Sequence, residues 1–269
     1  MTTARAAPRA GRARTLLVAL GLLLGAACQR PAPVVVIAHR GEHLHHPENT
    51  LPAIAAAFDL GADYAEVDVR TTADGELVLS HDAGVERCTT GHGLIAKMTL
   101  AELRALDAGV KLAPEFAGTR IPTFDEALDA ARGRGAIYVH VKAASAADLV
   151  RHIEAHGMVS GVVVYSDIAF ELRRLNPDLT VLPEAVSVEA TQKMIVLLQP
   201  RILAFSALDF SPDIIAVARQ AGIAMYVDRM GATDGPEGWR AAVAAGAAGI
   251  QTDHPGELVA FLRAAGRHP

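Results

Sequence analysis

The chain has 269 residues, 51% of them hydrophobic and 4% aromatic, and its formal net charge is −5. Charges of both signs are scattered, and no basic stripe of the kind that binds nucleic acid occurs, so nucleic acid is excluded as an expected partner. Removing the first 27 of the 269 residues leaves 242, the size of one large domain. No obligate protein partner is indicated.

Residues 1–27 have the pattern of an export signal. They combine a basic start without acidic residues, an apolar run over 16–24 and a small-residue exit, Gly25-Ala26-Ala27. The apolar run is short for a bilayer span, which makes a permanent transmembrane helix the weaker interpretation.

The signal runs directly into Cys28. Leu24 to Cys28 resembles a bacterial lipobox, in which Cys28 is lipidated and becomes the mature N-terminus. Gly25 stands where such boxes more usually have Leu, so ordinary signal-peptidase cleavage is the alternative. We expect an exported protein, anchored to a membrane through Cys28 and facing the periplasm or cell exterior, with residues 28–33 as a tether to a domain over 34–269.

From residue 34 onward, short β-branched runs alternate with alanine-rich helical stretches. This alternation is typical of repeated βα units around a parallel sheet. Eight runs are predicted strands: 34–38, 64–69, 136–141, 161–165, 179–182, 202–205, 224–227 and 248–252. The fold class predicted is therefore α/β, a (β/α)8 TIM barrel.

A ninth apolar run, Leu77 to Ser80, follows the second strand too closely for a parallel crossover. Asp74-Gly75 is typical of a hairpin turn, so we expect this run to pair antiparallel with the second strand. A two-residue turn would place Asp68 across from His81.

The connection between the second and third barrel strands is unusually long. Capping-box patterns at Thr99 and at Thr123 each predict the start of a helix. We interpret residues 82–122 as a cap segment inserted over the barrel mouth.

In such a barrel the active site forms at the carboxyl ends of the strands. Glu66 and Asp68 lie two residues apart on one predicted strand, so both side chains point to the same face. Two carboxylates there repel each other unless a cation lies between them, and hard oxygen ligands suit Ca²⁺, Mg²⁺ or Mn²⁺. The alternative is an ion pair with Lys142 or Arg40.

His39 and His81 are expected to approach these carboxylates from two flanks. Histidines titrate near neutrality, so a pair can divide the roles of base and acid. Arg40 offers a bidentate fork for a phosphate and Lys142 a second positive charge. The pattern indicates metal-assisted chemistry on a phosphate.

These segments resemble the glycerophosphodiester phosphodiesterase family over essentially Val34 to Pro255. The matching motifs are Ala38-His39-Arg40-Gly41, Pro47-Glu-Asn-Thr50, Gly61-Ala-Asp-Tyr-Ala-Glu66-Val-Asp68-Val, Asp74-Gly75, Val78-Leu-Ser-His81-Asp82, Phe116-Ala-Gly118, Ile121-Pro-Thr and Gly249-Ile-Gln-Thr-Asp253.

The resemblance implies a TIM barrel whose inserted cap helps hold a glycerol moiety. It also implies hydrolysis of glycerophosphodiesters to glycerol 3-phosphate and an alcohol with one divalent cation, Ca²⁺ or Mg²⁺. By the same resemblance, the residues divide by role into an acid/base pair (His39 and His81), metal ligands (Glu66 and Asp68) and phosphate-binding residues (Arg40 and Lys142).

Two positions depart from the family pattern. His140 stands where the family usually has an acidic metal ligand, and a neutral imidazole favours Mn²⁺ or Zn²⁺ over hard cations. Met225 stands where the family commonly has Trp, and Tyr226 beside it is expected to face the other side of the strand. Loss of a ring there leaves the alcohol head group open.

Other interpretations stay open at this point. The chain could be a phosphodiester-binding lipoprotein that has lost turnover, or a phospholipase D-like lyase on the same barrel. His43, His45 and His46 are expected to form an exposed polar loop, although one of them could complete a nitrogen-rich metal site with His140.

Overall fold

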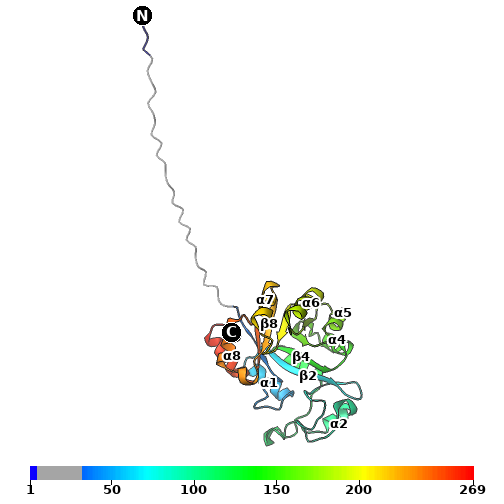
Figure 1. Ribbon diagram of the computed structural model, residues 1–269. Coiled ribbons are helices and arrows are strands. Elements are labelled where there is room, and N and C mark those ends of the chain that lie inside the picture. The colour runs from blue at the N-terminus through cyan, green and yellow to red at the C-terminus, as the bar shows by residue number, and fades with distance from the viewer. Residues whose placement is uncertain (5–31) are drawn as a thin grey trace. The chain divides into compact units, whose positions relative to one another are not determined.

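The computed structural model describes residues 1–4 and 32–269 (Figure 1). The predicted export signal and Cys28 fall almost entirely on residues 5–31, outside the described residues. Among the described helices, none is long and apolar enough to cross a membrane.

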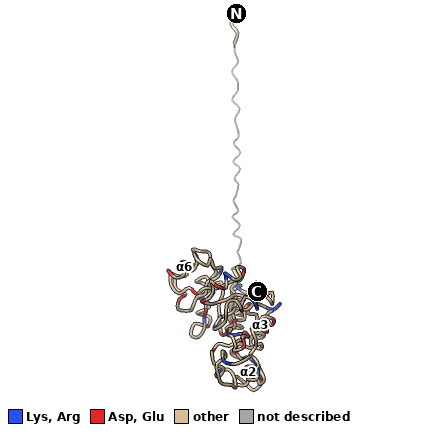
Figure 2. The backbone as a smooth tube through the Cα atoms, turned by 90° about the vertical axis from the view of Figure 1, so that its right-hand side faces the viewer, with Lys and Arg blue, Asp and Glu red and all other residues tan. Residues whose placement is uncertain are grey.

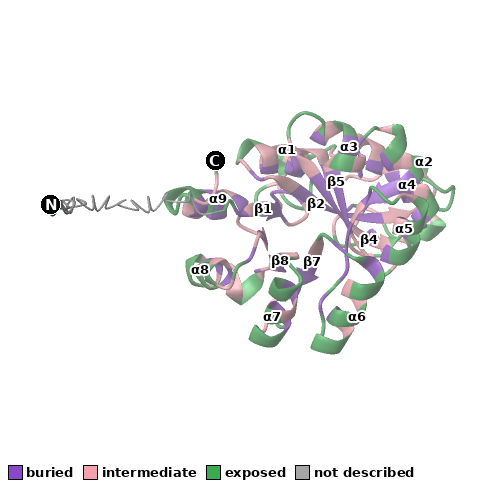
Figure 3. Ribbon diagram, turned by 90° about the horizontal axis from the view of Figure 1, so that it is seen from above, coloured by how far each residue is buried: buried purple, intermediate pink, exposed green. Residues whose placement is uncertain are grey.

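Eight parallel strands form a barrel surrounded by helices (Figures 1 and 3). They are β1 Val35–Ala38, β2 Tyr64–Thr71, β4 Ala136–Ala143, β5 Val162–Tyr165, β6 Thr180–Leu182, β7 Ile202–Phe205, β8 Ala224–Asp228 and β9 Gly249–Thr252. The sheet order is β6-β5-β4-β2-β1-β9-β8-β7, and a parallel bridge between Glu184 and Ala204 brings the two outer strands together. The predicted TIM barrel is confirmed, and each predicted strand is present.

The helices pack outside the strands and cover their outward faces (Figure 3). They are α1 Leu51–Asp59, α3 Phe124–Ala131, α4 Ala146–Ala155, α5 Ala169–Leu175, α6 Val188–Leu198, α7 Pro212–Gln220, α8 Pro236–Ala244 and α9 Pro255–Ala264. Most of the hydrophobic core lies between the two layers.

The barrel interior holds a second, smaller cluster: Ile37, Tyr138, Val163, Leu182, Ala204 and Tyr226. On β8, Met225 and Val227 belong to the layer under the helices, so Tyr226 points inward. Met225 and Tyr226 therefore lie on opposite faces of the strand, as expected, but Tyr226 is the one that points into the barrel, since burial of its two neighbours under the helices sets the phase of the strand.

The hairpin forms with a register one residue away from the predicted one. Strand β3, Leu77–Leu79, pairs antiparallel with β2, and the Ser80 N–H donates to the Asp68 carbonyl at 2.9 Å. Asp68 thus lies opposite Ser80, with His81 next along the chain. The two-residue turn would need positive φ at both Asp74 and Gly75, but only Gly75 has it (φ 87°), and a three-residue loop results.

Residues 82–122 carry short helices: η1 Ile95–Lys97, α2 Leu100–Arg104 and η2 Pro114–Phe116. They enclose a small apolar cluster of their own, including Val85, Ile95, Leu103, Ala108 and Ile121. Both predicted capping boxes are present, at Thr99 before α2 and at Thr123 before α3. Acidic and basic residues are interspersed over the described chain (Figure 2).

Candidate active site

Two buried carboxylates lie at the centre of the site, on β2. Glu66 and Asp68 are 0% and 1% exposed. Glu66 Oε2 accepts a hydrogen bond from the Arg40 backbone N–H at 2.7 Å. Asp68 Oδ2 accepts one from Asn49 Nδ2 at 2.8 Å, and the Asp68 backbone N–H donates to Asn49 Oδ1. One oxygen on each side chain, Glu66 Oε1 and Asp68 Oδ1, has no hydrogen-bond partner among the described residues.

His140 on β4 faces these two oxygens. It pairs with Asp68 in the parallel ladder, and its Nδ1 lies 3.5 Å from Asp68 Oδ1 and 3.8 Å from Glu66 Oε1. Burial, followed by the charge of Lys142, lowers the pKa of His140 to about 4, so the imidazole is neutral near neutral pH. A neutral nitrogen and two unpartnered carboxylate oxygens form a set that fits a divalent cation.

The electrostatics of the pair also favour a cation. Burial, together with the negative charge of Asp68, raises the pKa of Glu66. Without a compensating positive charge, two ionised carboxylates in this position are costly.

Arg40 and Lys142 both lie on the Asp68 side of the pair. Arg40 Nε is 3.6 Å from Asp68 Oδ2, and Lys142 Nζ is 3.4 Å from Asp68 Oδ1. The ion pairs considered as the alternative are therefore present, but neither forms a hydrogen bond to those Asp68 oxygens. Within the described chain, Glu66 has no Arg or Lys partner, so these pairs leave the need for a cation in place.

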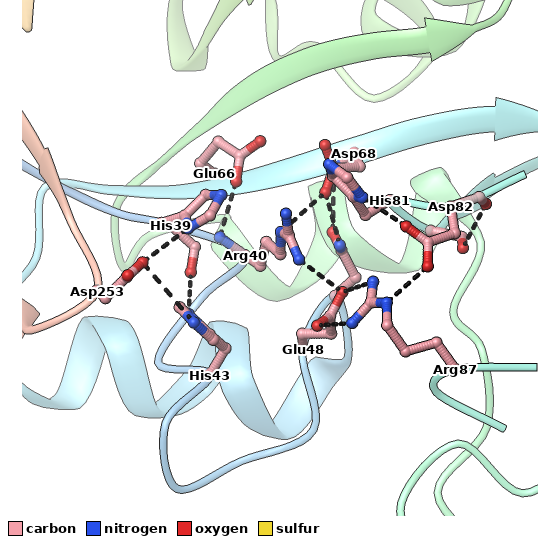
Figure 4. Close-up of polar contacts among 12 residues, drawn as sticks. His39, Arg40, His43, Glu48, Glu66, Asp68, His81, Asp82, Arg87 and Asp253 are labelled. Atoms are coloured by element: carbon pink, nitrogen blue, oxygen red, sulfur yellow. Dashed lines mark hydrogen bonds and ion pairs between the residues drawn. The ribbon is translucent and has the colours of Figure 1, made fainter. Parts of the chain in front are cut away.

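Each candidate acid/base histidine donates through Nδ1 to a carboxylate. His39 donates to Asp253 Oδ1 at 2.7 Å, and His81 donates to Asp82 Oδ1 at the same distance. Figure 4 shows His39 beside Glu66 and His81 beside Asp68. In both residues the carboxylate fixes the tautomer and leaves Nε2 for a substrate.

Asp253 also acts on the charge of His39. Burial alone would lower the pKa of this histidine, but the hydrogen bond to Asp253 and the charge of Glu66 outweigh it, so the pKa of His39 is raised. The pKa of Asp253 is lowered, because its contact with His39 outweighs its own burial.

The structure thus brings the seven predicted site residues to one barrel mouth. They are His39, Arg40, Glu66, Asp68, His81, His140 and Lys142. The sequence did not assign roles to their partners Asp253, Asp82 and Asn49, although all three lie inside the motifs that point to the family.

Glu48 and Arg87 were also missed. Arg87 donates to both Glu48 oxygens, at 2.6 and 2.8 Å, and to Asp82 Oδ2 at 2.6 Å. Glu48 in turn accepts a hydrogen bond from Arg40. Arg87 therefore connects the partner of Arg40 with the partner of His81, and no local sequence signal marks it.

The histidine loop is only partly exposed. His45 is 82% exposed at its side chain, while His43 is 17% exposed and donates through Nδ1 to the His39 carbonyl at 2.8 Å. His45 and His46 each contact Glu42. None of the three joins the group formed by Glu66, Asp68 and His140.

The chain has relatives among known proteins. Residues 39–155 match the family model described as the glycerophosphoryl diester phosphodiesterase family. The chain is 32% identical over 251 residues to a glycerophosphodiester phosphodiesterase of Caldanaerobacter subterraneus subsp. tengcongensis, which covers 86% of this chain and 99% of the relative.

Solved structures agree with the fold. A glycerophosphodiester phosphodiesterase from Agrobacterium tumefaciens has a TM-score of 0.77 and 28% identity, covering 84% of this chain and 99% of its own. An Oleispira antarctica phosphodiesterase in complex with the product sn-glycerol-3-phosphate has a TM-score of 0.79 and 24% identity, covering 85% and 96%. From the long match to the Caldanaerobacter enzyme and the family model, the chain belongs to the glycerophosphodiester phosphodiesterase family and is a phosphoric diester hydrolase.

Proposed function

We propose that this protein is a metal-dependent enzyme that hydrolyses glycerophosphodiesters to glycerol 3-phosphate and an alcohol outside the cytoplasm. The observation that carries the proposal is the pair of unpartnered oxygens on Glu66 and Asp68, which face His140 between two histidine–carboxylate pairs. The name of the Caldanaerobacter relative supports the substrate class.

Glu66, Asp68 and His140 would hold the cation. When bound, a divalent cation supplies Lewis-acid polarisation of a phosphate oxygen and charge compensation for the carboxylates. Because one ligand is an imidazole, we expect Mn²⁺ or Zn²⁺ to be preferred over Ca²⁺ or Mg²⁺.

The two histidines divide the proton transfers. One Nε2 accepts a proton from the nucleophile, and the other donates a proton to the leaving oxygen. Asp253 and Asp82 hold the two rings in the tautomer that leaves Nε2 free. Arg40 and Lys142 would bind the phosphate from the Asp68 side, where both side chains lie.

Residues 82–122 are proposed to serve as the cap that helps hold the glycerol moiety. A cavity of about 190 Å³ separates this segment from the loop after β1, and its lining includes Glu48, Arg87 and Lys111. Glu48 can accept hydrogen bonds from the hydroxyl groups of a polyol, and Arg87 and Lys111 can donate hydrogen bonds to them.

Export and anchoring through Cys28 rest on the N-terminal sequence. We expect the full-length protein, expressed in a bacterium, to partition into the detergent phase and to incorporate a labelled fatty acid. Cys28→Ala should abolish both. Unchanged labelling of the variant would contradict the anchor.

The activity is tested by measuring glycerol 3-phosphate release from several glycerophosphodiesters across a panel of divalent metals, with His140→Glu alongside. We expect wild-type turnover with Mn²⁺ or Zn²⁺, and a shift of the variant towards Ca²⁺ or Mg²⁺. Release by the variant but not by the wild type with any metal would favour a binding protein. Activity confined to intact lipid, with a cyclic product, would favour a lyase.

A further inference from the structure

A second group of ligand-type atoms lies beside the catalytic centre, between the loop after β1 and the end of β9. It consists of His39, His43 and Asp253, each of which offers one ring nitrogen or carboxylate oxygen within 4.8 Å of the others. Figure 4 shows the three side chains next to one another. Their side chains are 15%, 17% and 24% exposed, so water can reach the group.

The hydrogen bonds determine where the lone pairs lie. A carbonyl oxygen only accepts, so the bond from His43 to the His39 carbonyl places a proton on His43 Nδ1. His43 Nε2 lies 3.7 Å from Asp253 Oδ1. A neutral His43 therefore has its lone pair on Nε2, the atom that lies near this carboxylate oxygen, and a cation bound by both atoms would use that lone pair.

We propose that His39, His43 and Asp253 form a second cation site, selective for a transition metal such as Zn²⁺, and that its occupation by Zn²⁺ in excess of the amount that fills the Glu66–Asp68–His140 site inhibits the enzyme. Two imidazole nitrogens with one carboxylate oxygen form a ligand set typical of Zn²⁺, whereas Ca²⁺ and Mg²⁺ prefer oxygen ligands throughout. Water can supply the fourth position of a tetrahedral site.

The two contacts with Asp253 Oδ1 require only small adjustments. Metal–ligand bonds of about 2.0–2.1 Å in a tetrahedral site separate neighbouring ligand atoms by about 3.3 Å. The contact between His39 Nδ1 and Asp253 Oδ1 would lengthen from 2.7 Å, and that between His43 Nε2 and the same oxygen would shorten from 3.7 Å.

Inhibition follows from the proton inventory of His39. A metal–Nδ1 bond needs the tautomer whose single proton is on Nε2, so a neutral His39 moves its proton from Nδ1 to Nε2 through solvent, and a protonated His39 releases its Nδ1 proton to solvent. His39 can then accept no proton at Nε2, and it can donate one only by becoming an imidazolate. Either catalytic role is lost. This inhibitory consequence rests on the proposed function, whereas metal binding does not.

Binding is tested first without the catalytic metal site. In a Glu66→Gln/Asp68→Asn double variant, we expect Zn²⁺ titration calorimetry to detect one bound ion. Adding His43→Gln should weaken that binding at least tenfold, because Gln keeps a donor for the His39 carbonyl but offers no imidazole. His45→Gln is the matched control and should bind as the double variant does.

A spectroscopic measurement guards against misfolded variants. Co²⁺ added to the folded double variant, checked by circular dichroism, should give the visible absorption of a tetrahedral site, and His43→Gln should remove it. If the double variant does not fold, the wild type should bind one more Zn²⁺ than His43→Gln alone. Equal binding with and without His43 would overturn the proposal.

Inhibition is tested with Mn²⁺-activated enzyme. Excess Zn²⁺ should inhibit the wild type and His45→Gln, while His43→Gln should keep its basal activity and need at least tenfold more Zn²⁺ for the same inhibition. Equal sensitivity of all three proteins would overturn the inhibitory role. Absence of phosphodiesterase activity with any metal would refute the proposed function but leave the binding experiments decisive.

Discussion

At the scale of single residues, His39 and His81 make the same kind of hydrogen bond in different environments. Both donate through Nδ1 to a carboxylate, yet the side chain of His39 is 15% exposed and that of His81 is 35% exposed. Asp82 also accepts a hydrogen bond from Arg87. In the described chain, the ion-pair partners of Asp253 are His39 and His43 only. His39 therefore depends more on its single carboxylate.

Asp253→Asn is expected to reduce kcat by about 10²-fold or more, the size of a typical general acid or base contribution. The neutral amide of Asn is a weaker acceptor than the carboxylate and no longer fixes the tautomer of His39. The substitution also removes a contact that raises the pKa of His39. That pKa should fall, so the limb of the pH–rate profile that belongs to His39 should move to lower pH.

The measurement is a pH profile of kcat for both proteins. Movement of the acidic limb would assign His39 as the base, and movement of the basic limb would assign it as the acid. Asp82→Asn is the matched comparison for His81. A profile that Asp253→Asn does not shift would contradict the positioning role.

The sequence predicted the site residues that lie on strands better than the residues that hydrogen-bond to the site residues. The spacing of Glu66 and Asp68 on one strand was enough to place both on one face. The partnership of His39 with Asp253 joins residues 214 positions apart, and only the closed barrel brings them together. Asn49 was missed for a different reason: it holds Asp68 from a loop with positive φ (56°), which no periodicity encodes.

At the scale of elements, the hairpin of β2 and β3 determines where His81 lies. The predicted pairing was wrong by one residue because the loop has three residues rather than two. Local turn chemistry selects between these loops by backbone conformation, and Asp74-Gly75 is compatible with both. The existence of the hairpin was predictable, but its register was not.

Arg87 connects residues 82–122 to the site. This side chain bridges Glu48 and Asp82, and through them it reaches Arg40 and His81. Because Arg87 is 45% exposed, each ion pair contributes about 1 kcal/mol or less to stability. Its main effect should therefore be on geometry at the mouth.

Arg87→Lys is expected to lower kcat/KM for glycerophosphodiesters about tenfold, because one ammonium group cannot reproduce the guanidinium fork that joins two carboxylates. Steady-state kinetics should be accompanied by a denaturation midpoint, which we expect to change little. Arg132→Lys, which alters an exposed ion pair on α3's C-terminal side, is the control. Equal kinetics for the two variants would argue against a role for Arg87 in the site.

At the scale of the whole molecule, the barrel buries charge that its function needs. The eight strands and the surrounding helices exclude water from Glu66 and Asp68, so the fold loses stability whenever both are ionised without a compensating cation. Alternation of strands and helices predicted the barrel correctly, since that pattern depends on local burial repeated along the chain.

Glu66→Gln is therefore expected to make the cation-free protein more stable than the cation-free wild type at pH 8. The pKa of Glu66 is raised in the folded state, so the folded protein binds the proton more tightly than the unfolded chain. Its contribution to stability is complete below the ordinary carboxyl pKa of 4.5 and is lost as the pH rises towards the raised value. The advantage of the variant should be about 1 kcal/mol or more at pH 8 and should shrink towards pH 5, as measured by urea unfolding with chelator present.

Adding Mn²⁺ at about 100 times its Kd should stabilise the wild type by about 2.7 kcal/mol, with a smaller gain for the variant, and so reverse their order. If the variant were less stable than the wild type at both pH values with chelator present, the buried, ionised Glu66 would not destabilise the cation-free protein, and no cation would be needed to offset its charge.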